Sequence, residues 1–251
     1  MEAMTRRLAE ERVISLFIRL HPLHNYPEPT LTEFGQVVEH GPTVWIDLGV
    51  TEEELWSQTR SRVRTYINRM HREGYAFEVD SEWRGLDEFA RLYTQTMKRV
   101  GAEAGYFFDR QYFEDLRDNL GEHAHLAVVR AGEEIACAGI FSEVSGLVEY
   151  HLGGTEDVHR KLGPTRLLFH HMARWAKERG NHTLHLGGGV GAAEDSLFHF
   201  KAGFSPHRAT FRSWRVACDS EALAAASAAA GLVEADGFFP PYRGPRKPPI
   251  D

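Results

Sequence analysis

Hydrophobic positions along the chain follow the two-residue period of strands in some stretches and the helical period in others. Apolar runs bounded by turn residues predict strands over 13–20, 43–48, 75–80, 124–131, 133–144, 146–154, 182–188 and 207–217. Amphipathic or alanine-rich stretches predict helices over 51–74, 86–100, 109–120, 165–180, 195–203 and 221–232. Proline-rich, mixed-polarity sequence predicts a loop with one short turn over 21–41 and a mobile or surface-draped tail over 238–251.

Two local signals support this order of elements. Thr51 precedes three glutamates, which predicts a capped helix start at that position. The turn pairs Ala131-Gly132 and Ser145-Gly146 separate three consecutive strands, which indicates an antiparallel meander.

Composition narrows the class of protein. With 251 residues, 42% hydrophobic and 26% charged, the chain is long and apolar enough to fold around a core, which excludes disordered and collagen-like proteins. No apolar run approaches the ~18 residues of a membrane span, and the charged N-terminus favours a cytoplasmic location. Because 36 acidic residues outnumber 29 basic ones, contact with nucleic acid requires a local basic patch. Cys137 and Cys218 are too few for a disulfide scaffold.

The order of elements over 75–217 resembles the GNAT acyltransferase fold. That fold is α+β, a mixed and mostly antiparallel sheet flanked by helices. The segments EYHLGGTEDVHRKLGPTRLLFHHMARWAKERGNHTLHLGGG and EDSLFHFKAGFSP are similar to the Fem (FemABX) branch of that superfamily, as is the upstream sequence around VISLFIRLHPL. We therefore expect a partial N-terminal GNAT-like subdomain over 1–74, the acyltransferase domain over 75–217, and a C-terminal helix and tail over 218–251.

The Fem resemblance implies an aminoacyltransferase that moves an aminoacyl group from aminoacyl-tRNA to an amine of a peptide, cell-wall precursor or secondary metabolite. The charged tRNA is then a co-substrate, and no cofactor is expected. Relative to the family the N-terminal subdomain is short, so a smaller acceptor, a partner, a second copy in a homodimer or a truncated chain would each account for it. The alternatives are an N-acetyltransferase that uses an acyl-CoA such as acetyl-CoA, and a non-catalytic GNAT-like binding module.

The candidate catalytic residues are Lys201, Tyr150 and His151. The segment HFKAGF resembles the family's F-K-x-x-F, which implies that Lys201, beside Phe200, contacts the tRNA end or the transferring acyl group. A fixed ammonium stabilises the oxyanion that forms when an amine attacks an ester. Tyr150 and His151 are neighbours on one strand, so only one of them can face a cleft, and the resemblance favours Tyr150. A packing role is the alternative for each.

Arginines are concentrated in the predicted helix 51–74. Arg62, Arg69 and Arg72 are spaced seven and three apart, so they share one face and could contact tRNA phosphates. Tyr66 lies among them and could stack on a base. A solvated face balanced by the acidic residues 52–54 is the alternative.

An aromatic segment, GYFFDRQYF, supplies candidate substrate-binding residues at the start of helix 109–120. Tyr112 lines up with a substrate-contacting tyrosine of the cell-wall Fem enzymes, and Tyr106 and Phe108 flank it. Those enzymes often have an arginine where Phe108 stands, so its absence argues against an acceptor linked to a nucleoside diphosphate. Arg99 is a candidate to replace the missing arginine. The alternative for the aromatic residues is that they only pack together in a core.

The segment RKLGPT occupies the position of the Q/R-x-x-G-x-G/A loop that cradles pyrophosphate in acetyl-CoA-dependent GNAT enzymes. Arg160 and Gly163 fit that pattern and would bind the cofactor if an acyl-CoA is the donor. Pro164 removes one N–H donor and Thr165 replaces the second glycine, which weakens the acyl-CoA alternative.

Fourteen histidines raise the question of a metal site. His170 and His171 are adjacent on a helix and are expected to diverge, and His182 and His185 are expected on opposite faces of a strand. No spacing makes a convincing ligand set, so we expect no metal. The sequence also lacks a nucleophile-elbow motif, which favours direct transfer over a covalent acyl-enzyme.

Overall fold

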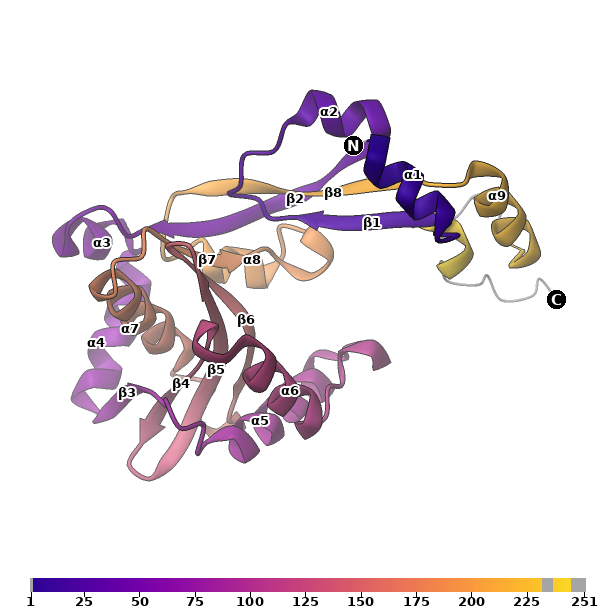
Figure 1. Ribbon diagram of the computed structural model, residues 1–251. Coiled ribbons are helices and arrows are strands. Elements are labelled where there is room, and N and C mark those ends of the chain that lie inside the picture. Colours follow the sequence, from indigo (N-terminus) through magenta and orange to yellow (C-terminus); the bar gives the residue numbers. More distant parts are fainter. Residues whose placement is uncertain (1, 232–236, 245–251) are drawn as a thin grey trace. The chain divides into compact units, whose positions relative to one another are not determined.

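The computed structural model describes residues 2–231 and 237–244 (Figure 1). The chain divides into two compact units, one formed by the described residues of 1–42 and 209–251 and the other by 43–208. The boundaries of these two units differ from those of the expected segments 1–74, 75–217 and 218–251, and the three segments stay a prediction. In the part of the chain that the structure describes, no helix is both long and apolar enough to cross a membrane.

The unit of residues 43–208 carries the central sheet, in which the strands follow the order β2-β7-β6-β5-β4-β3. Neighbouring strands are antiparallel except for β6 and β7, which are parallel. Its strands are the end of β2 (Gln36–Asp47), β3 (Tyr75–Val79), β4 (Ala124–Ala131), β5 (Glu134–Val144), β6 (Leu147–Thr155) and β7 (Thr183–Gly187). Its α-helices are α3 (Glu52–Gln58), α4 (Ser61–Arg72), α5 (Leu86–Val100), α6 (Arg110–Leu120), α7 (Thr165–Glu178) and α8 (Ser196–Lys201).

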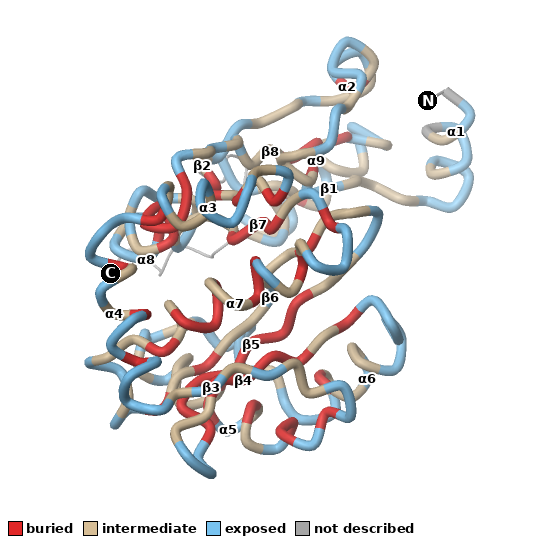
Figure 2. Tube along the Cα trace, turned by 90° about the vertical axis from the view of Figure 1, so that its left-hand side faces the viewer, coloured by how far each residue is buried: buried red, intermediate tan, exposed pale blue. Residues whose placement is uncertain are grey.

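Helices cover both faces of this sheet, as the alternation of side chains along the strands requires. On β4, Ala127 and Val129 pack in a core with α4 and α7, whereas Leu126 and Val128 pack in a second core with α5 and α6. Strands β4 and β5 are accordingly the most continuously buried segments (Figure 2). The expected α+β fold, a mixed and mostly antiparallel sheet flanked by helices, is confirmed.

The other unit contains α1 (Glu2–Glu10), β1 (Ser15–Leu20), α2 (Glu28–Phe34), the first part of β2, β8 (Arg208–Ala217) and α9 (Ser220–Ala229). Strand β8 pairs antiparallel with β1 and lies between β1 and β2. A small core joins α2 to β8, where the Trp214 indole N–H donates to the Leu31 carbonyl at 2.8 Å. The expected tail over 238–251 lies outside the described residues from position 245 onward, and position 232 of the expected helix 221–232 is also outside them.

Two expectations about the first half of the chain are wrong. The predicted helix 51–74 is two helices. The helical conformation is interrupted at Thr59 and Arg60, where the Arg60 N–H donates to the Gly203 carbonyl at 2.8 Å. The predicted loop 21–41 contains α2 and the first half of β2. The capped helix start at Thr51 is confirmed, with the hydroxyl accepting from the Glu54 N–H and the Glu54 carboxylate accepting from the Thr51 N–H.

Candidate functional site

Strands β6 and β7 diverge shortly after they begin to pair. Their parallel register joins Leu147 through Glu149 to Thr183 through His185 and ends there, although both strands continue. The two strands are thus adjacent but splayed over the rest of their length. The divergence leaves the backbone of Gly187 and Gly188 without a strand partner from β6.

Lys201 fills this gap. Its helix α8 is capped by Asp195, whose carboxylate accepts hydrogen bonds from the N–H groups of Phe198 and Val190. From the last residue of α8 the Lys201 ammonium donates to the Gly188 carbonyl at 2.7 Å, and it lies 5.8 Å from the centre of the Tyr150 ring. The site thus combines Lys201 of α8, Tyr150 of β6 and Gly188, the residue that follows β7.

Burial tunes the charge of Lys201. The residue is only 6% exposed, and desolvation lowers its pKa from 10.5 to about 8, against the opposing attraction of Asp195 and Glu149. The ammonium is therefore mostly protonated at neutral pH but weakly solvated. Such a cation interacts more strongly with a nearby developing negative charge than a surface lysine does.

The Tyr150 ring packs against Phe169, with ring centres 4.8 Å apart, and against Phe141 at 5.3 Å. Its hydroxyl lies above Gly153, where a Cβ atom would overlap it, so the absence of a side chain at this glycine gives the ring its place. Burial raises the pKa of Tyr150, which keeps the phenol protonated and able to donate a hydrogen bond.

His151 lies apart from Lys201, at a bulge of β6 where the pairing with β5 shifts between Ile140 and Phe141. Its Nε2 is 3.4 Å from the Tyr112 hydroxyl, and the Tyr112 ring stacks on Phe108 with centres 4.0 Å apart. Desolvation by neighbouring side chains lowers the pKa of His151. The structure therefore separates the predicted residues into two groups, Lys201 with Tyr150 and His151 with Tyr112 and Phe108.

The remaining predicted substrate residues are placed differently. Phe200 packs against Phe169 and Phe204 on the Lys201 side. Tyr106 exposes its side chain to solvent, and its carbonyl accepts a hydrogen bond from the Tyr93 hydroxyl. The Arg99 guanidinium pairs with Asp157 at 2.7 Å, so it is already neutralised.

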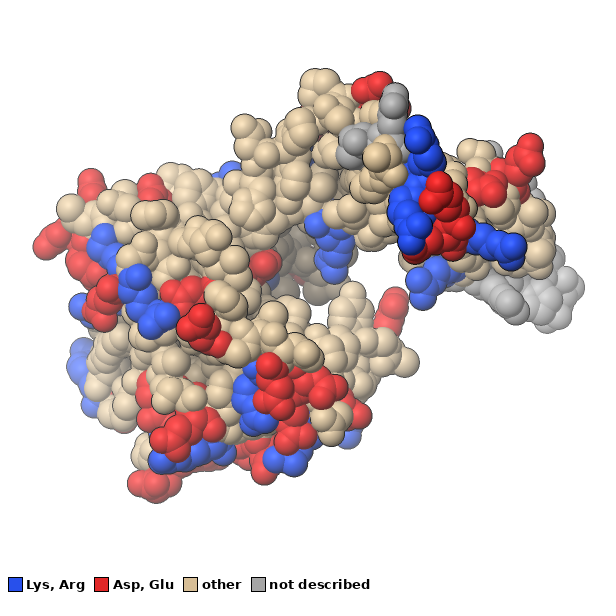
Figure 3. All heavy atoms as spheres, viewed as in Figure 1, with Lys and Arg blue, Asp and Glu red and all other residues tan. Residues whose placement is uncertain are grey.

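Arg62, Arg69 and Arg72 are exposed on α4. Arg69 pairs with Glu73 at 2.6 Å, whereas Arg62 and Arg72 make no ion pair within the described ranges. On the α5–α6 side, by contrast, acidic and basic side chains are interspersed (Figure 3).

Arg166 is a candidate that the sequence reasoning missed. Its guanidinium lies 4.5 Å from the centre of the Tyr66 ring and 5.2 Å from that of Phe200, and no described acidic side chain pairs with it. Its Nε is buried without a hydrogen-bond partner among the described residues, and desolvation lowers the pKa of Arg166. The sequence does contain a signal for it, because Arg166 ends the basic segment RKLGPTR.

The RKLGPT loop uses three of its N–H donors within the backbone, because Arg160 donates to the Asp157 carbonyl and both Leu162 and Gly163 donate to the His159 carbonyl. At the start of α7, the N–H groups of Arg166 and Leu167 donate to the carbonyls of Gly163 and Pro164. Gly163 has a φ of 66°, and a Cβ there would overlap the Arg166 guanidinium, so this side chain fills the space above the glycine. Arg160 is exposed, 3.8 Å from the Asp157 carboxylate.

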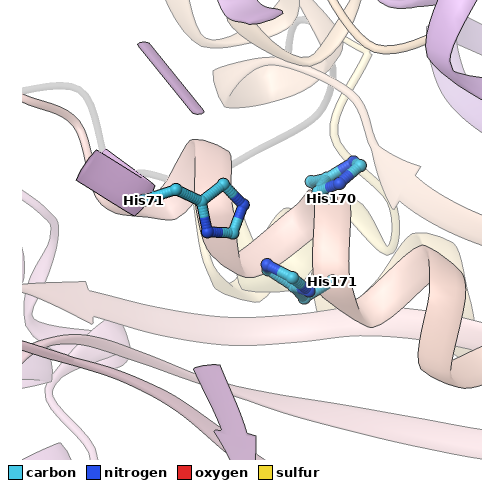
Figure 4. A group of neighbouring side chains, drawn as sticks. All are labelled: His71, His170 and His171. Atoms are coloured by element: carbon cyan, nitrogen blue, oxygen red, sulfur yellow. The ribbon is translucent and has the colours of Figure 1, made fainter. Parts of the chain in front are cut away.

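Three histidines lie together between α4 and α7 (Figure 4). His71, His170 and His171 each offer a ring nitrogen, and these three atoms lie within 4.8 Å of one another. The expectation that His170 and His171 diverge is wrong, since their ring centres are 5.1 Å apart and a nitrogen of each lies within 4.8 Å of the other. Burial, followed by neighbouring charge, lowers the pKa of His170 to about 3 and that of His171 to about 4, so both imidazoles are neutral.

Comparison with known proteins identifies a family. The model of the acetyltransferase (GNAT) domain matches residues 57–202. None of the curated proteins matches the sequence significantly.

Solved structures share the fold at low identity. FemX is 16% identical with a TM-score of 0.66, over 84% of this chain and 74% of FemX. L-PGS from Bacillus licheniformis is 18% identical with a TM-score of 0.60, over 85% of this chain and 71% of its own. A tandem GNAT protein from the clavulanic acid biosynthesis pathway is 14% identical with a TM-score of 0.50, over 87% and 69%.

Proposed function

Since the chain belongs to the GNAT acetyltransferase-domain family and has its acyltransferase fold, we propose that it is an aminoacyltransferase that uses aminoacyl-tRNA as the donor. The acceptor is an amine of a peptide, cell-wall precursor or secondary metabolite. The observation that carries the proposal is the buried ammonium of Lys201 where β6 and β7 diverge. The similarity of residues 149–206 to the Fem branch supports the choice of donor.

The reaction requires few groups from the protein. The amine attacks the ester carbonyl of the charged tRNA, a C–N bond forms, and the carbonyl oxygen becomes an oxyanion. The C–O bond to the ribose then breaks, and the proton lost by the amine ends on the ribose oxygen. In this scheme Lys201 stabilises the oxyanion, a contribution of about 3–4 kcal/mol for a well-placed donor. Tyr150, which is protonated and whose ring centre lies 5.8 Å from the Lys201 ammonium, is the candidate donor to the leaving oxygen.

Basic side chains on the Lys201 side suit the phosphates of a tRNA end. Arg166 lies against Tyr66 and Phe200 with no acidic partner among the described residues, and Phe200 directly precedes Lys201. Arg62 lies on the helix that carries Tyr66 and is close enough to Arg166 to lower its pKa. An anion bound here would relieve the repulsion between these two arginines, which favours phosphate binding.

An acyl-CoA donor is less well supported. A pyrophosphate cradle needs free N–H groups at the start of the helix, but three N–H groups of the loop donate to backbone carbonyls and Pro164 has none. The Arg166 side chain also fills the space above Gly163. Arg160 is exposed and only 3.8 Å from the Asp157 carboxylate that Arg99 also contacts, so an acyl-CoA is the alternative donor that the experiment has to exclude.

Acceptor recognition is assigned to the second group of predicted residues. Tyr112, Phe108 and His151 combine stacked rings with a hydroxyl and an imidazole, which suits a small acceptor with both apolar and polar parts. Phe108 stacks on Tyr112, so no guanidinium fork is present at that position to hold a diphosphate.

The test uses a total pool of tRNAs charged with radiolabelled amino acids, incubated with the purified protein and a cell extract. We expect a labelled amide that resists mild base, unlike the ester of the tRNA, and that disappears when the pool is treated with ribonuclease first. Lys201→Met should form much less of this amide. Its matched control is Lys98→Met, which replaces an exposed lysine on α5 and should form as much amide as wild type. Isothermal titration with coenzyme A should show no saturable binding. Acetyl transfer from acetyl-CoA to an amine of the extract, with no transfer from any charged tRNA, would overturn the proposal.

A further inference from the structure

The strongest feature outside the proposed active site is the three-histidine cluster, His71, His170 and His171. His71 lies in the last turn of α4, and the other two lie in the middle of α7 (Figure 4). One nitrogen of each ring lies within 4.8 Å of the other two. Helix packing has therefore brought together three strong metal donors from distant parts of the sequence.

These imidazoles have no other polar role in the structure. None of them hydrogen-bonds or pairs with another residue in the ranges 2–231 and 237–244. Aromatic side chains hold two of the rings: His171 stacks on Phe77 with centres 5.3 Å apart, and His170 lies 5.1 Å from Trp56. Three close imidazoles without acceptors leave their lone pairs free for a common ligand.

The spacing is compatible with one metal ion. Zinc binds imidazole nitrogen at about 2.0–2.1 Å, so two nitrogens in a tetrahedral site are about 3.4 Å apart. The present limit of 4.8 Å requires the rings to move inward by about an ångström. His71 is exposed and His170 and His171 are half-buried, so rotation of the side chains is sufficient.

We propose that His71, His170 and His171 bind one Zn²⁺ ion, with water as the fourth ligand. Three nitrogen donors without a carboxylate suit zinc and its neighbours in the transition series, whereas Mg²⁺ and Ca²⁺ require oxygen ligands. The ion would fasten the C-terminal turn of α4 to α7. The proposal is independent of the donor and acceptor proposed above.

A pocket of about 310 Å³ lies next to the cluster and is lined by His71, His170 and the exposed pair Glu52–Arg174, whose charged atoms are 3.0 Å apart. Ile67 and Phe204 form apolar parts of its wall. The fourth ligand position therefore has room for water or for a small ligand that replaces it, a feature of catalytic rather than closed structural zinc sites.

The test is metal binding to protein stripped with EDTA. We expect one equivalent of Zn²⁺ per chain by competition with a chromophoric chelator. Co²⁺ should give the intense visible bands of a tetrahedral site, and Zn²⁺ should abolish them. Mg²⁺ should not compete. A hundredfold excess of Zn²⁺ over its dissociation constant should raise the melting temperature by roughly 5–10 °C.

Variants locate the ion. His71→Ala, His170→Ala and His171→Ala should each weaken Zn²⁺ binding on the order of a hundredfold or more. The control His182→Ala, an exposed histidine outside the cluster, should bind like wild type. A cooperative melting transition in EDTA establishes that each variant is folded. If a variant does not fold, the Co²⁺ spectrum of the wild-type protein still tests whether the site is tetrahedral. Absence of stoichiometric binding, an octahedral Co²⁺ spectrum, or binding that survives all three cluster substitutions would overturn the proposal.

Discussion

Burying Lys201 has a cost in stability that can be measured. Its pKa falls from 10.5 to about 8, and one pKa unit corresponds to about 1.4 kcal/mol, so the charged form loses about 3 kcal/mol on folding. Lys201→Met keeps most of the side-chain volume and removes the charge. It also removes the hydrogen bond to the Gly188 carbonyl, worth about 1 kcal/mol. The variant should therefore be more stable than wild type by about 2 kcal/mol near about pH 7.

The gain should depend on pH in a defined direction. The folded pKa of Lys201 lies below the unfolded one, so between about pH 8 and about pH 10.5 the unfolded chain binds more protons. Wild type gains stability as the pH rises through that window, and the methionine variant lacks this contribution. The advantage of Lys201→Met should shrink above about pH 8 and vanish near about pH 9.5, and by about pH 10.5 the variant should be less stable than wild type by about 1 kcal/mol, the value of the lost hydrogen bond.

Urea unfolding at about pH 7 and about pH 10 measures the effect, because the difference between the two proteins cancels the titration of every group they share. Lys98→Met serves as the control and should differ from wild type by less than about 0.5 kcal/mol at both pH values. If Lys201→Met is less stable than wild type by the same amount at both pH values, the reasoning about a desolvated ammonium is refuted.

Three further outcomes are expected. Neutralising Arg62, Arg69 and Arg72 together should weaken tRNA binding at every sequence and flatten its salt dependence by about two to three phosphate contacts, as measured by filter binding over a salt series. Arg166→Met should raise KM for charged tRNA on the order of tenfold and leave the melting temperature unchanged. An unchanged KM would show that Arg166 only packs against Tyr66 and Phe200. Gly153→Ala, which displaces the Tyr150 hydroxyl, should cost about 1–3 kcal/mol in urea unfolding and lower transfer, whereas full stability would contradict the packing of that ring.

Local patterns were sufficient for many elements of the fold. Helix α5 was predicted to its observed ends, Leu86 and Val100, because its apolar face is regular and Gly101 follows it with a positive φ. The meander β4-β5-β6 followed from its two glycine turns. The break between α3 and α4 was not predicted, since it depends on a hydrogen bond from Arg60 to Gly203, far away in the sequence.

The sequence predicted those features of the candidate site that depend on residues close together in the chain. Strand alternation predicted that Tyr150 and His151 face different ways, and their contacts do differ, although β6 is bulged at this point. The burial of Lys201 and the stacking of Arg166 on Tyr66 depend on how α8, α7 and α4 pack. The three-histidine cluster was missed for the same reason, because its third member comes from a different helix.

The central claim is that Lys201 supports aminoacyl transfer from a charged tRNA, and the rate of labelled amide formation under single-turnover conditions tests it most directly. Wild type and Lys98→Met should form the amide at equal rates, and Lys201→Met should be slower on the order of a hundredfold or more while remaining folded. A near-wild-type rate for Lys201→Met, measured with the true acceptor and a charged tRNA, would contradict the claim.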